Sequence, residues 1–568
     1  MWYNKNRARE CFVNSQEIEK RPTGVVSQFL FFLFFLITIG VAAQEASEEK
    51  FRLLKEQVEM EDGVKLATDV YLPTEDGKYP VILVRTPYNK DHIKGAIPGY
   101  IERGYAVVSQ DCRGKFLSEG EFYPFVNERR DGLKTVAWIE QQPWYNGKIG
   151  GQGSSYNGYT QWAVSDKLDV VLADMTGTNI YDLIYPNGLF SLETAFNWGL
   201  VVGAQIVNHI PPDKALKSYW HLPLSIADDS TVKDIPFIND WIRNEEDGQY
   251  WEKQNHQRHV SGDLLSIGGW YDIFALTQLE DFVKYDERNP DHKGKLVMGP
   301  WCHGPQGFKN EYGGNKVTGR RGELHNMFLD QALLGKTFDQ MPGPFTDHTY
   351  NFFIMERNEY FGSETWPPKE MKPTAFYPGD APLSSAGPQK KKGQAGYTYD
   401  PSDPFKSLGG TALGPAVGPA LQNPNENRKD QLIFETEVLE KPLTLLGPVT
   451  SKLFVSSNVS ETDFFVNLQD VFPDGNIINI LEGGQTVNLQ PGTGPVEVEI
   501  ESWPTGYQVN PGHKLRVVIT SSWFPRFNRN LNSGEGAFEG KDTVKAEQVL
   551  YYGKKWPSRI ILPVVELD

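Results

Sequence analysis

The chain has 568 residues and a formal net charge of −17. Hydrophobic residues make up 39% of it and aromatic residues 12%, which is enough to fill real cores, so the composition excludes a disordered chain. At roughly 100–200 residues per domain, the length predicts two to four domains. The charge argues against nucleic-acid binding, which needs a basic face, because the one lysine run (390–392) lies in a Gly/Pro/Ser-rich stretch.

The N-terminus carries the pattern of a targeting signal. Lys20 and Arg21 precede the apolar run 29–40, and small residues follow up to Ala43. This order is typical of a secretory signal peptide over residues 1–43, cleaved after Ala43, and predicts a secreted or periplasmic protein. The stretch 25–43 also approaches the length of a short membrane span, so an uncleaved anchor is the alternative, and only then would the protein stay on the membrane.

From about 51 to 170, strand patterns alternate with a helical pattern. The runs 79–88 and 105–114 are continuously apolar and end at turn residues, as buried parallel strands do. A period-two strand over 64–73, a helix within 128–144 and a short strand that begins at 147 complete the series. This alternation predicts a doubly wound sheet with functional residues at the carboxyl ends of its strands.

The middle of the chain changes character twice. Between about 175 and 255 it is polar, aromatic and helical, with helices expected within 192–210 and 234–251. Strand patterns resume at 263–272 and 294–304, and an amphipathic helix is expected over 321–335. The helical stretch therefore reads as a cap inserted into the sheet domain.

After about 348, short β runs recur between Gly/Pro turns. This pattern predicts an all-β sandwich or jelly roll. The segment 378–430 is rich in Gly, Pro, Ser and Asn and is expected to be an extended connection. The runs are 350–356, 430–439, 451–457, 462–472, 496–503 and 513–522.

Two adjacent serines lie in the segment "GGQGSSYNGY", which resembles the strand-to-helix turn that presents a catalytic serine. Such a nucleophile elbow needs small residues where the backbone is crowded. Gly153 lies two residues before Ser155, whereas the bulky Gln152 lies two before Ser154. Ser155 is therefore the better candidate for the nucleophile.

The same segment departs from the G-x-S-x-G pattern of the elbow. Asn157 stands where the second glycine belongs, and Gly158 comes one residue later. Asn tolerates a positive φ better than most residues, which favours an elbow in spite of the mismatch. An ordinary Gly/Ser loop is the alternative.

A catalytic serine needs a base, and the base needs an orienting acid. In an α/β hydrolase the order is serine, acid, histidine, each after a strand. Asp272 ends one predicted strand and His303 follows the next. Taken alone, His303 reads as a buried structural histidine, but three residues at three strand ends favour a triad of Ser155, Asp272 and His303.

The attack of a serine creates an oxyanion that needs hydrogen-bond donors. One candidate is the backbone N–H of Tyr156, directly after the nucleophile, and the other is Tyr88 in the loop "RTPYNK" (85–90) at the end of the strand pattern 79–88. A phenol has a pKa near 10 and keeps its proton at neutral pH. The alternative for Tyr88 is a tyrosine packed at a strand end.

Seven segments together resemble the CocE/NonD hydrolases, the family that includes cocaine esterase, X-prolyl dipeptidyl peptidases of family S15, α-amino acid ester hydrolases and glutaryl-7-ACA acylases. In that family the extra residue before the second elbow glycine is normal. The segments are "RTPYNK", "DCRGKFLSEGEF", "GSSYNG", "GWYD", "GPWCHG", "DFFVNLQDVFPDG" and "SSWFPRFNRN".

The resemblance implies an α/β-hydrolase domain with an inserted helical cap and a C-terminal jelly roll. It also implies Ser155, Asp272 and His303 as the triad, with Tyr88 and the Tyr156 amide as the oxyanion hole. The implied boundaries are 1–43 for the signal peptide, 44–174 and 256–347 for the hydrolase domain, 175–255 for the cap and 348–568 for the jelly roll.

One departure from the family bears on the substrate. The α-amino acid ester hydrolases carry acidic residues for the substrate ammonium just after the catalytic aspartate, and this chain has Ile273, Phe274 and Ala275 there. The sequence therefore argues against aminated acyl groups, unless Asp182 or Glu193 of the cap supplies the missing carboxylate.

The sequence thus predicts a secreted serine hydrolase that cleaves an ester or amide of a small molecule or short peptide through an acyl-enzyme. The Trp- and Tyr-rich cap indicates an apolar or aromatic acyl pocket. No metal or organic cofactor is implied, and no CxxC pair is present. Cys112 and Cys302 can pair only if the fold brings them together. The rival functions are an X-prolyl dipeptidyl aminopeptidase and an inactive surface- or glycan-binding protein.

Overall fold

The computed structural model describes residues 51–206, 212–229, 234–256, 259–303, 320–388, 390–414 and 417–567. The predicted signal peptide lies outside these residues. Phe51 to Asp568 form one compact unit. Across the described ranges, none of the helices combines the length and the apolar character that a membrane span requires.

The first sheet has ten strands in the order β1-β2-β4-β3-β5-β6-β7-β8-β9-β10. Strands β4 to β9 in this order run parallel, and the edge pairs are antiparallel. The strands are β1 (Arg52–Glu59), β2 (Lys65–Leu72), β3 (Tyr79–Thr86), β4 (Ala106–Asp111), β5 (Tyr145–Ser154), β6 (Val170–Asp174), β7 (Asp263–Tyr271), β8 (Gly294–Cys302), β9 (Tyr350–Ile354) and β10 (Glu359–Ser363).

Helices cover both faces of this sheet. Neighbouring residues of a strand point to opposite faces, and a Cβ added to Gly150 would meet α11, whereas one added to Gly151 would meet α3. The predicted α/β-hydrolase fold is therefore confirmed, with a continuous run of apolar side chains in its buried strands. The helices are α1 (Ile97–Glu102), α2 (Glu128–Glu140), α3 (Tyr156–Trp162), α9 (Ala275–Arg288) and α11 (Arg321–Leu334).

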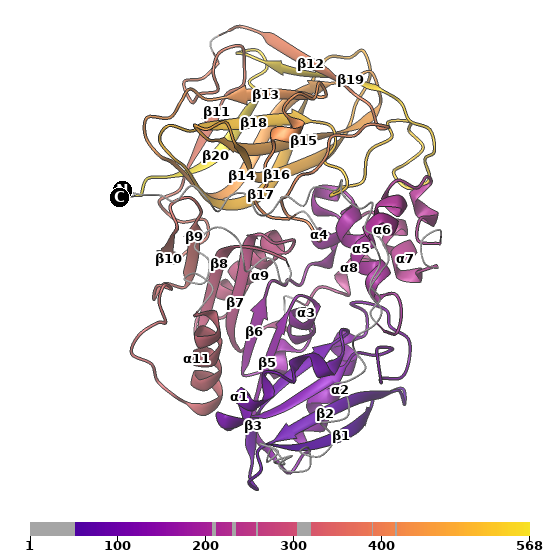
Figure 1. Ribbon diagram of the computed structural model, residues 1–568, viewed down its shortest axis with the longest axis vertical. Helices are drawn as coiled ribbons and strands as arrows, with labels where there is room; N and C mark the ends of the chain where they lie inside the picture. Colours follow the sequence, from indigo (N-terminus) through magenta and orange to yellow (C-terminus); the bar gives the residue numbers. More distant parts are fainter. Residues whose placement is uncertain are drawn as a thin grey trace, which may run out of the picture. The chain divides into compact units, whose positions relative to one another are not determined.

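Among the described residues between β6 and β7 the chain forms five short α-helices (Figure 1). The helix expected within 234–251 is divided into two helices, α7 and α8. Asn244 ends α7 and Gly248 precedes α8, and neither residue has a helical backbone conformation. The helices are α4 (Ile180–Ile184), α5 (Leu192–Val202), α6 (Pro212–Tyr219), α7 (Pro236–Arg243) and α8 (Gln249–Glu252). We call this group the cap.

The C-terminal part is all-β, as predicted (Figure 1). The segment 378–430, expected to be an extended connection, also contains a strand, β12, which pairs with β19. The strands are β11 (Lys372–Phe376), β12 (Gly393–Tyr399), β13 (Gln431–Glu435), β14 (Leu443–Ser456), β15 (Glu461–Val471), β16 (Ile477–Asn488), β17 (Val496–Val509), β18 (Lys514–Thr520), β19 (Ala546–Tyr552) and β20 (Arg559–Val565).

The first β run assigned to the C-terminal part belongs to the other sheet. Strand β9, within the run 350–356, pairs in parallel with β8, and β10 continues the same sheet. All five residues of β9 are buried, and a continuous apolar run is typical of a parallel strand covered on both faces. The assignment of this run to the β domain is therefore corrected.

Candidate active site

Ser155 occupies a strained turn between β5 and α3. Its backbone has φ 57° and ψ −130°, a conformation that costs free energy for a residue with a side chain. A Cβ on Gly153 would lie 2.1 Å from the carbonyl carbon and oxygen of Asn157. A Cβ on Gly158 would lie 2.5 Å from Thr176 Cγ2. The turn therefore requires glycine at 153 and at 158. The second glycine comes one residue later than in the G-x-S-x-G pattern because residue 158, rather than 157, packs against Thr176, two residues after the end of β6.

The Asn157 side chain points toward the loop that follows β3. Its Nδ2 lies 3.4 Å from His92 Nε2, and His92 Nδ1 lies 2.8 Å from the Asn89 carbonyl oxygen. The carbonyl can only accept, so Nδ1 carries the hydrogen and Nε2 accepts from the amide. Asn157 thus ties the helix after the elbow to the loop that contains Tyr88.

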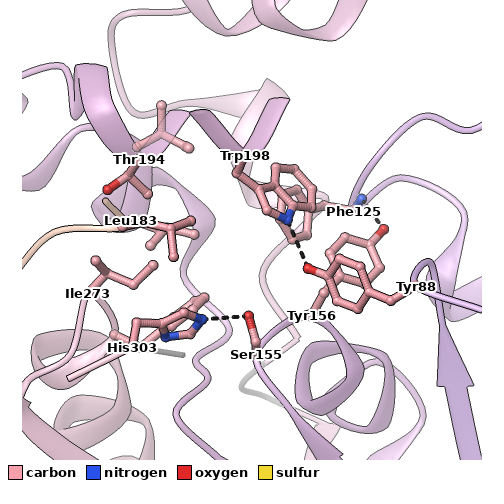
Figure 2. Close-up of a pocket in the computed structure, with 12 residues that line it drawn as sticks. Tyr88, Phe125, Ser155, Tyr156, Leu183, Thr194, Trp198, Ile273 and His303 are labelled. Atoms are coloured by element: carbon pink, nitrogen blue, oxygen red, sulfur yellow. Dashed lines mark hydrogen bonds between the residues drawn. The ribbon is translucent and has the colours of Figure 1, made fainter. Parts of the chain in front are cut away.

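The three predicted triad residues form one hydrogen-bonded chain. Ser155 Oγ lies 2.9 Å from His303 Nε2 (Figure 2). His303 Nδ1 lies 2.8 Å from Asp272 Oδ2. The Asp272 side chain is fully buried, and its Oδ1 accepts a 2.8 Å hydrogen bond from the Phe274 N–H. This second bond fixes the carboxylate, which in turn orients the imidazole toward the serine.

Tyr88 lies beside Ser155, at the end of β3. Its hydroxyl oxygen accepts a 2.8 Å hydrogen bond from Trp198 Nε1 (Figure 2). Burial raises the pKa of Tyr88 to about 12, although hydrogen bonds with Trp198 and Ser155 act in the opposite direction. The phenol is therefore protonated at neutral pH and can donate.

The side chain of Tyr156, the first residue of α3, is fixed by two hydrogen bonds and a ring contact. Its hydroxyl donates to Glu128 and accepts a 2.9 Å hydrogen bond from the Phe125 N–H. Its ring stacks on Trp198 at 5.7 Å between centroids. Burial raises the pKa of Glu128 to about 7, partly offset by the Tyr156 hydrogen bond. The sequence pointed to Tyr156 but not to Glu128, Phe125 or Trp198, which come from two distant segments, 125–128 and α5, and carry no motif.

A cavity of about 30 Å³ opens onto Ser155. We call it the Ser155 cavity. Its wall is almost wholly apolar away from the triad and Tyr88, and none of the described lining residues is an acid. The lining residues are Tyr88, Phe125, Ser155, Tyr156, Leu183, Ile184, Thr194, Trp198, Ile273, Phe274, His303 and Leu413.

Neither carboxylate considered for an ammonium group lines this cavity. Burial, and then the charges of Glu280 and Asp247, raise the pKa of Asp182 to about 7. Burial also raises the pKa of Glu193 to about 7, against the opposing charge of Arg526. At pH 7 each carboxyl is therefore about half protonated, and neither lines the cavity in which a substrate ammonium would be bound.

The two cysteines within the described residues are free and buried. Burial raises the pKa of Cys302 to about 11 and raises the pKa of Cys112 further. They are therefore inert thiols rather than a disulfide. In the described part of the chain no three His, Cys, Asp or Glu side chains gather in a way that could hold a metal ion.

Comparison with known families gives two matches along the chain. The profile of the X-Pro dipeptidyl-peptidase (S15 family) matches residues 62–305. The profile of the X-Pro dipeptidyl-peptidase C-terminal non-catalytic domain matches residues 349–561. The first match contains all five predicted site residues.

Individual relatives cover nearly the whole chain. Cocaine esterase of Rhodococcus sp. (strain MB1 Bresler) is 32% identical, over 90% of this chain and 98% of its own. An aminopeptidase from a marine sediment Thaumarchaeota archaeon superposes with a TM-score of 0.77 at 21% identity, over 91% and 97% of the two chains. An α-amino acid ester hydrolase superposes with a TM-score of 0.76 at 22% identity, over 92% and 98%. At these identities the two structures support the fold alone.

Proposed function

This chain belongs to the CocE/NonD family of serine hydrolases, and we propose that it hydrolyses carboxylic esters with small, uncharged, apolar acyl groups. The observation that carries the proposal is the hydrogen-bonded chain Ser155–His303–Asp272 at the edge of an apolar cavity. Ester hydrolysis needs a nucleophile, a base and a binding site for the acyl group, and these lie together here.

In the proposed reaction Ser155 Oγ attacks the ester carbonyl carbon while His303 Nε2 takes the serine proton. The carbonyl π electrons move to the oxygen, where the Tyr88 hydroxyl and the Tyr156 N–H stabilise the charge. Asp272 holds the imidazole and stabilises its protonated form. His303 then gives the proton to the leaving alcohol, and water, activated by the same histidine, releases the acid.

The proposed substrate class follows from the walls of the Ser155 cavity. Ile273 and Phe274 occupy the positions where an acidic pair would be needed, and both line the cavity. A buried ammonium without a counter-charge costs several kcal/mol, on the order of the penalty for any unpaired buried ion. The small volume of the cavity accommodates a few heavy atoms. Acetyl and butyryl esters fit this description better than aminoacyl esters.

The family profile, with its description as an X-Pro dipeptidyl-peptidase, favours peptide cleavage as a second candidate. The two candidates separate in a comparison of p-nitrophenyl acetate, butyrate and benzoate with an X-Pro p-nitroanilide, with Ser155→Ala as the blank. We expect kcat/KM to be highest for acetate or butyrate and at least about 100-fold lower for the anilide. Anilide cleavage without ester cleavage would overturn the proposal.

We also propose that the protein is exported from the cytoplasm. The support is the succession of basic residues, an apolar run and small residues before Gln44, which is the pattern of a signal peptide. Expression with the native N-terminus, followed by mass measurement of the exported chain, tests it. A mature protein that begins at Gln44 is the expected result. A chain that retains residues 1–43 in the membrane fraction would instead establish the anchor.

A further inference from the structure

The hydrogen bond between Trp198 and Tyr88 has only one possible direction. The indole Nε1–H can donate but cannot accept. At 2.8 Å between Trp198 Nε1 and Tyr88 Oη, the phenol oxygen must therefore be the acceptor. The single phenol hydrogen is then free to point away from the indole.

The remaining direction faces the reacting atoms. Figure 2 shows the Tyr88 hydroxyl directed into the Ser155 cavity, with the indole on one side of it and Ser155 on the other. An oxyanion donor must be aimed before the charge develops, because reorientation during the reaction costs part of the stabilisation. The indole supplies this aim by occupying the acceptor side of the phenol.

The Trp198 side chain is itself held in one orientation. Its ring stacks on Trp241 at 6.1 Å with an interplanar angle of 13°, and on Phe125 at 5.5 Å and 26°. It also stacks on Tyr156 at 5.7 Å and 22°. Tyr156 carries the second proposed donor on its backbone. One residue of α5 therefore contacts both residues of the proposed oxyanion hole.

We propose that Trp198 is a positioning residue that aims the Tyr88 hydroxyl at the oxyanion, so that the cap helix α5 completes the oxyanion hole. Trp198 takes no part in bond making, because the indole hydrogen stays bonded to Nε1 throughout the reaction. The inference rests on the proposed function, because it needs Ser155 to attack a carbonyl and Tyr88 to donate to the resulting oxygen.

A double-mutant cycle tests this coupling with p-nitrophenyl acetate as substrate. Tyr88→Phe removes the donor and should lower kcat about 10²–10³-fold. Trp198→Phe removes the indole N–H and keeps an aromatic ring; it should lower kcat about 10-fold with KM within about threefold, since the donor remains but is no longer aimed. In the Tyr88→Phe background, Trp198→Phe should have no further effect on kcat.

The matched control is Trp241→Phe. It removes the neighbouring indole of the same stack, in the same cap, and does not touch Tyr88. If Trp198 merely packs the cap, the two tryptophan variants will lose similar activity, and the Trp198→Phe loss will persist in the Tyr88→Phe background. Similar losses in the two tryptophan variants would overturn the inference. A loss from Trp198→Phe that persists in the Tyr88→Phe background would also overturn it, and this is the result expected if the substitution damages the fold.

Binding of phenylboronic acid gives a second readout. The boronic acid forms a tetrahedral, negatively charged adduct on the serine and so reports on the oxyanion hole without turnover. Its inhibition constant should rise about 10-fold in Trp198→Phe, in parallel with the loss of kcat. An unchanged constant would contradict the proposal. Wild-type protein that neither hydrolyses the ester nor binds the boronic acid would instead refute the proposed function, whereas full activity of Trp198→Phe refutes this inference alone.

Discussion

The two sides of the Ser155 cavity are built in different ways. On one side, Ser155, Asp272 and His303 each follow a strand of the first sheet, so the backbone of the sheet sets their separations. On the other side, Leu183 and Trp198 of the cap meet Leu413, more than two hundred residues further along the chain. The sheet side supplies the proposed reacting groups at fixed points, and the cap side supplies a wall whose shape depends on how separate segments pack.

This difference indicates that the chemistry resides on the sheet side and the substrate specificity on the cap side. A triad at strand ends tolerates little change, because each group must meet the next within hydrogen-bond distance. An apolar wall can change volume by one side chain and still exclude water. The two sides should therefore respond to substitution in different ways, and the following variants test that expectation.

The largest effect is expected at Asp272. Asp272→Asn leaves a side chain of the same size but disturbs the tautomer of His303, and kcat should fall about 10⁴-fold in the p-nitrophenyl acetate assay. Asp174→Asn is the matched control, because Asp174 Oδ1 bonds His325 Nε2 at 3.0 Å in a similar pair at the end of β6. Comparable losses in both variants would show that the sheet side is not organised around Ser155.

The next effect is expected at the elbow. In Gly153→Ala the new methyl group would meet backbone atoms of Asn157 at 2.1 Å, which cannot move aside as a side chain does. The free energy of unfolding should fall by about 3 kcal/mol, measured by urea denaturation, with loss of activity. Gly99→Ala in α1 meets open space, and we expect it to be neutral or slightly stabilising. Equal behaviour of the two variants would remove the steric explanation of the elbow.

A smaller, pH-dependent effect is expected at Glu128, which begins α2 and accepts a hydrogen bond from the Tyr156 hydroxyl. Its raised pKa means that the native state holds a proton which the unfolded state releases, so the free energy of unfolding should fall as pH rises from about 4.5 to about 7. Glu128→Gln resembles the protonated acid. The variant should match wild type at pH 4.5 and exceed it by about 2 kcal/mol at pH 8. A constant difference between the two proteins across this range would contradict the shift.

The smallest effect is expected from a change in the cap wall. Leu183→Ala enlarges the Ser155 cavity and should raise the kcat/KM ratio of p-nitrophenyl benzoate to acetate about 10-fold, while phenylboronate still binds. Leu216→Ala is the control, because Leu216 lies in the cap and is 48% exposed. If Leu183→Ala instead lowers kcat for both esters equally, the cap wall does more than select the acyl group.

The sequence predicted the sheet side well because its signals are local. Continuous apolar runs marked the strands, and the residues that follow them, Asp272 and His303, lie where the pattern placed them. Gly153 singled out Ser155 over Ser154, but the reason for Gly158 lies in Thr176, two residues after the end of the neighbouring strand β6.

The cap side could not be predicted in the same way. The hydrogen bond from Trp198 to Tyr88 joins residues 110 positions apart, and no local spacing encodes it. The same limit of local patterns explains the misplaced strand β9, whose apolar run fits either sheet until its partner β8 is known. Tertiary contacts, rather than periodicity, decide such cases.

The most direct test of Ser155 as the nucleophile is the mass of the protein after reaction with a fluorophosphonate. Wild type and Ser154→Ala should each gain one phosphonyl group, and Ser155→Ala should gain none, because the neighbouring serine lacks the bond to His303. Labelling of Ser155→Ala, or no labelling of the wild type, would contradict the claim that Ser155 is the nucleophile.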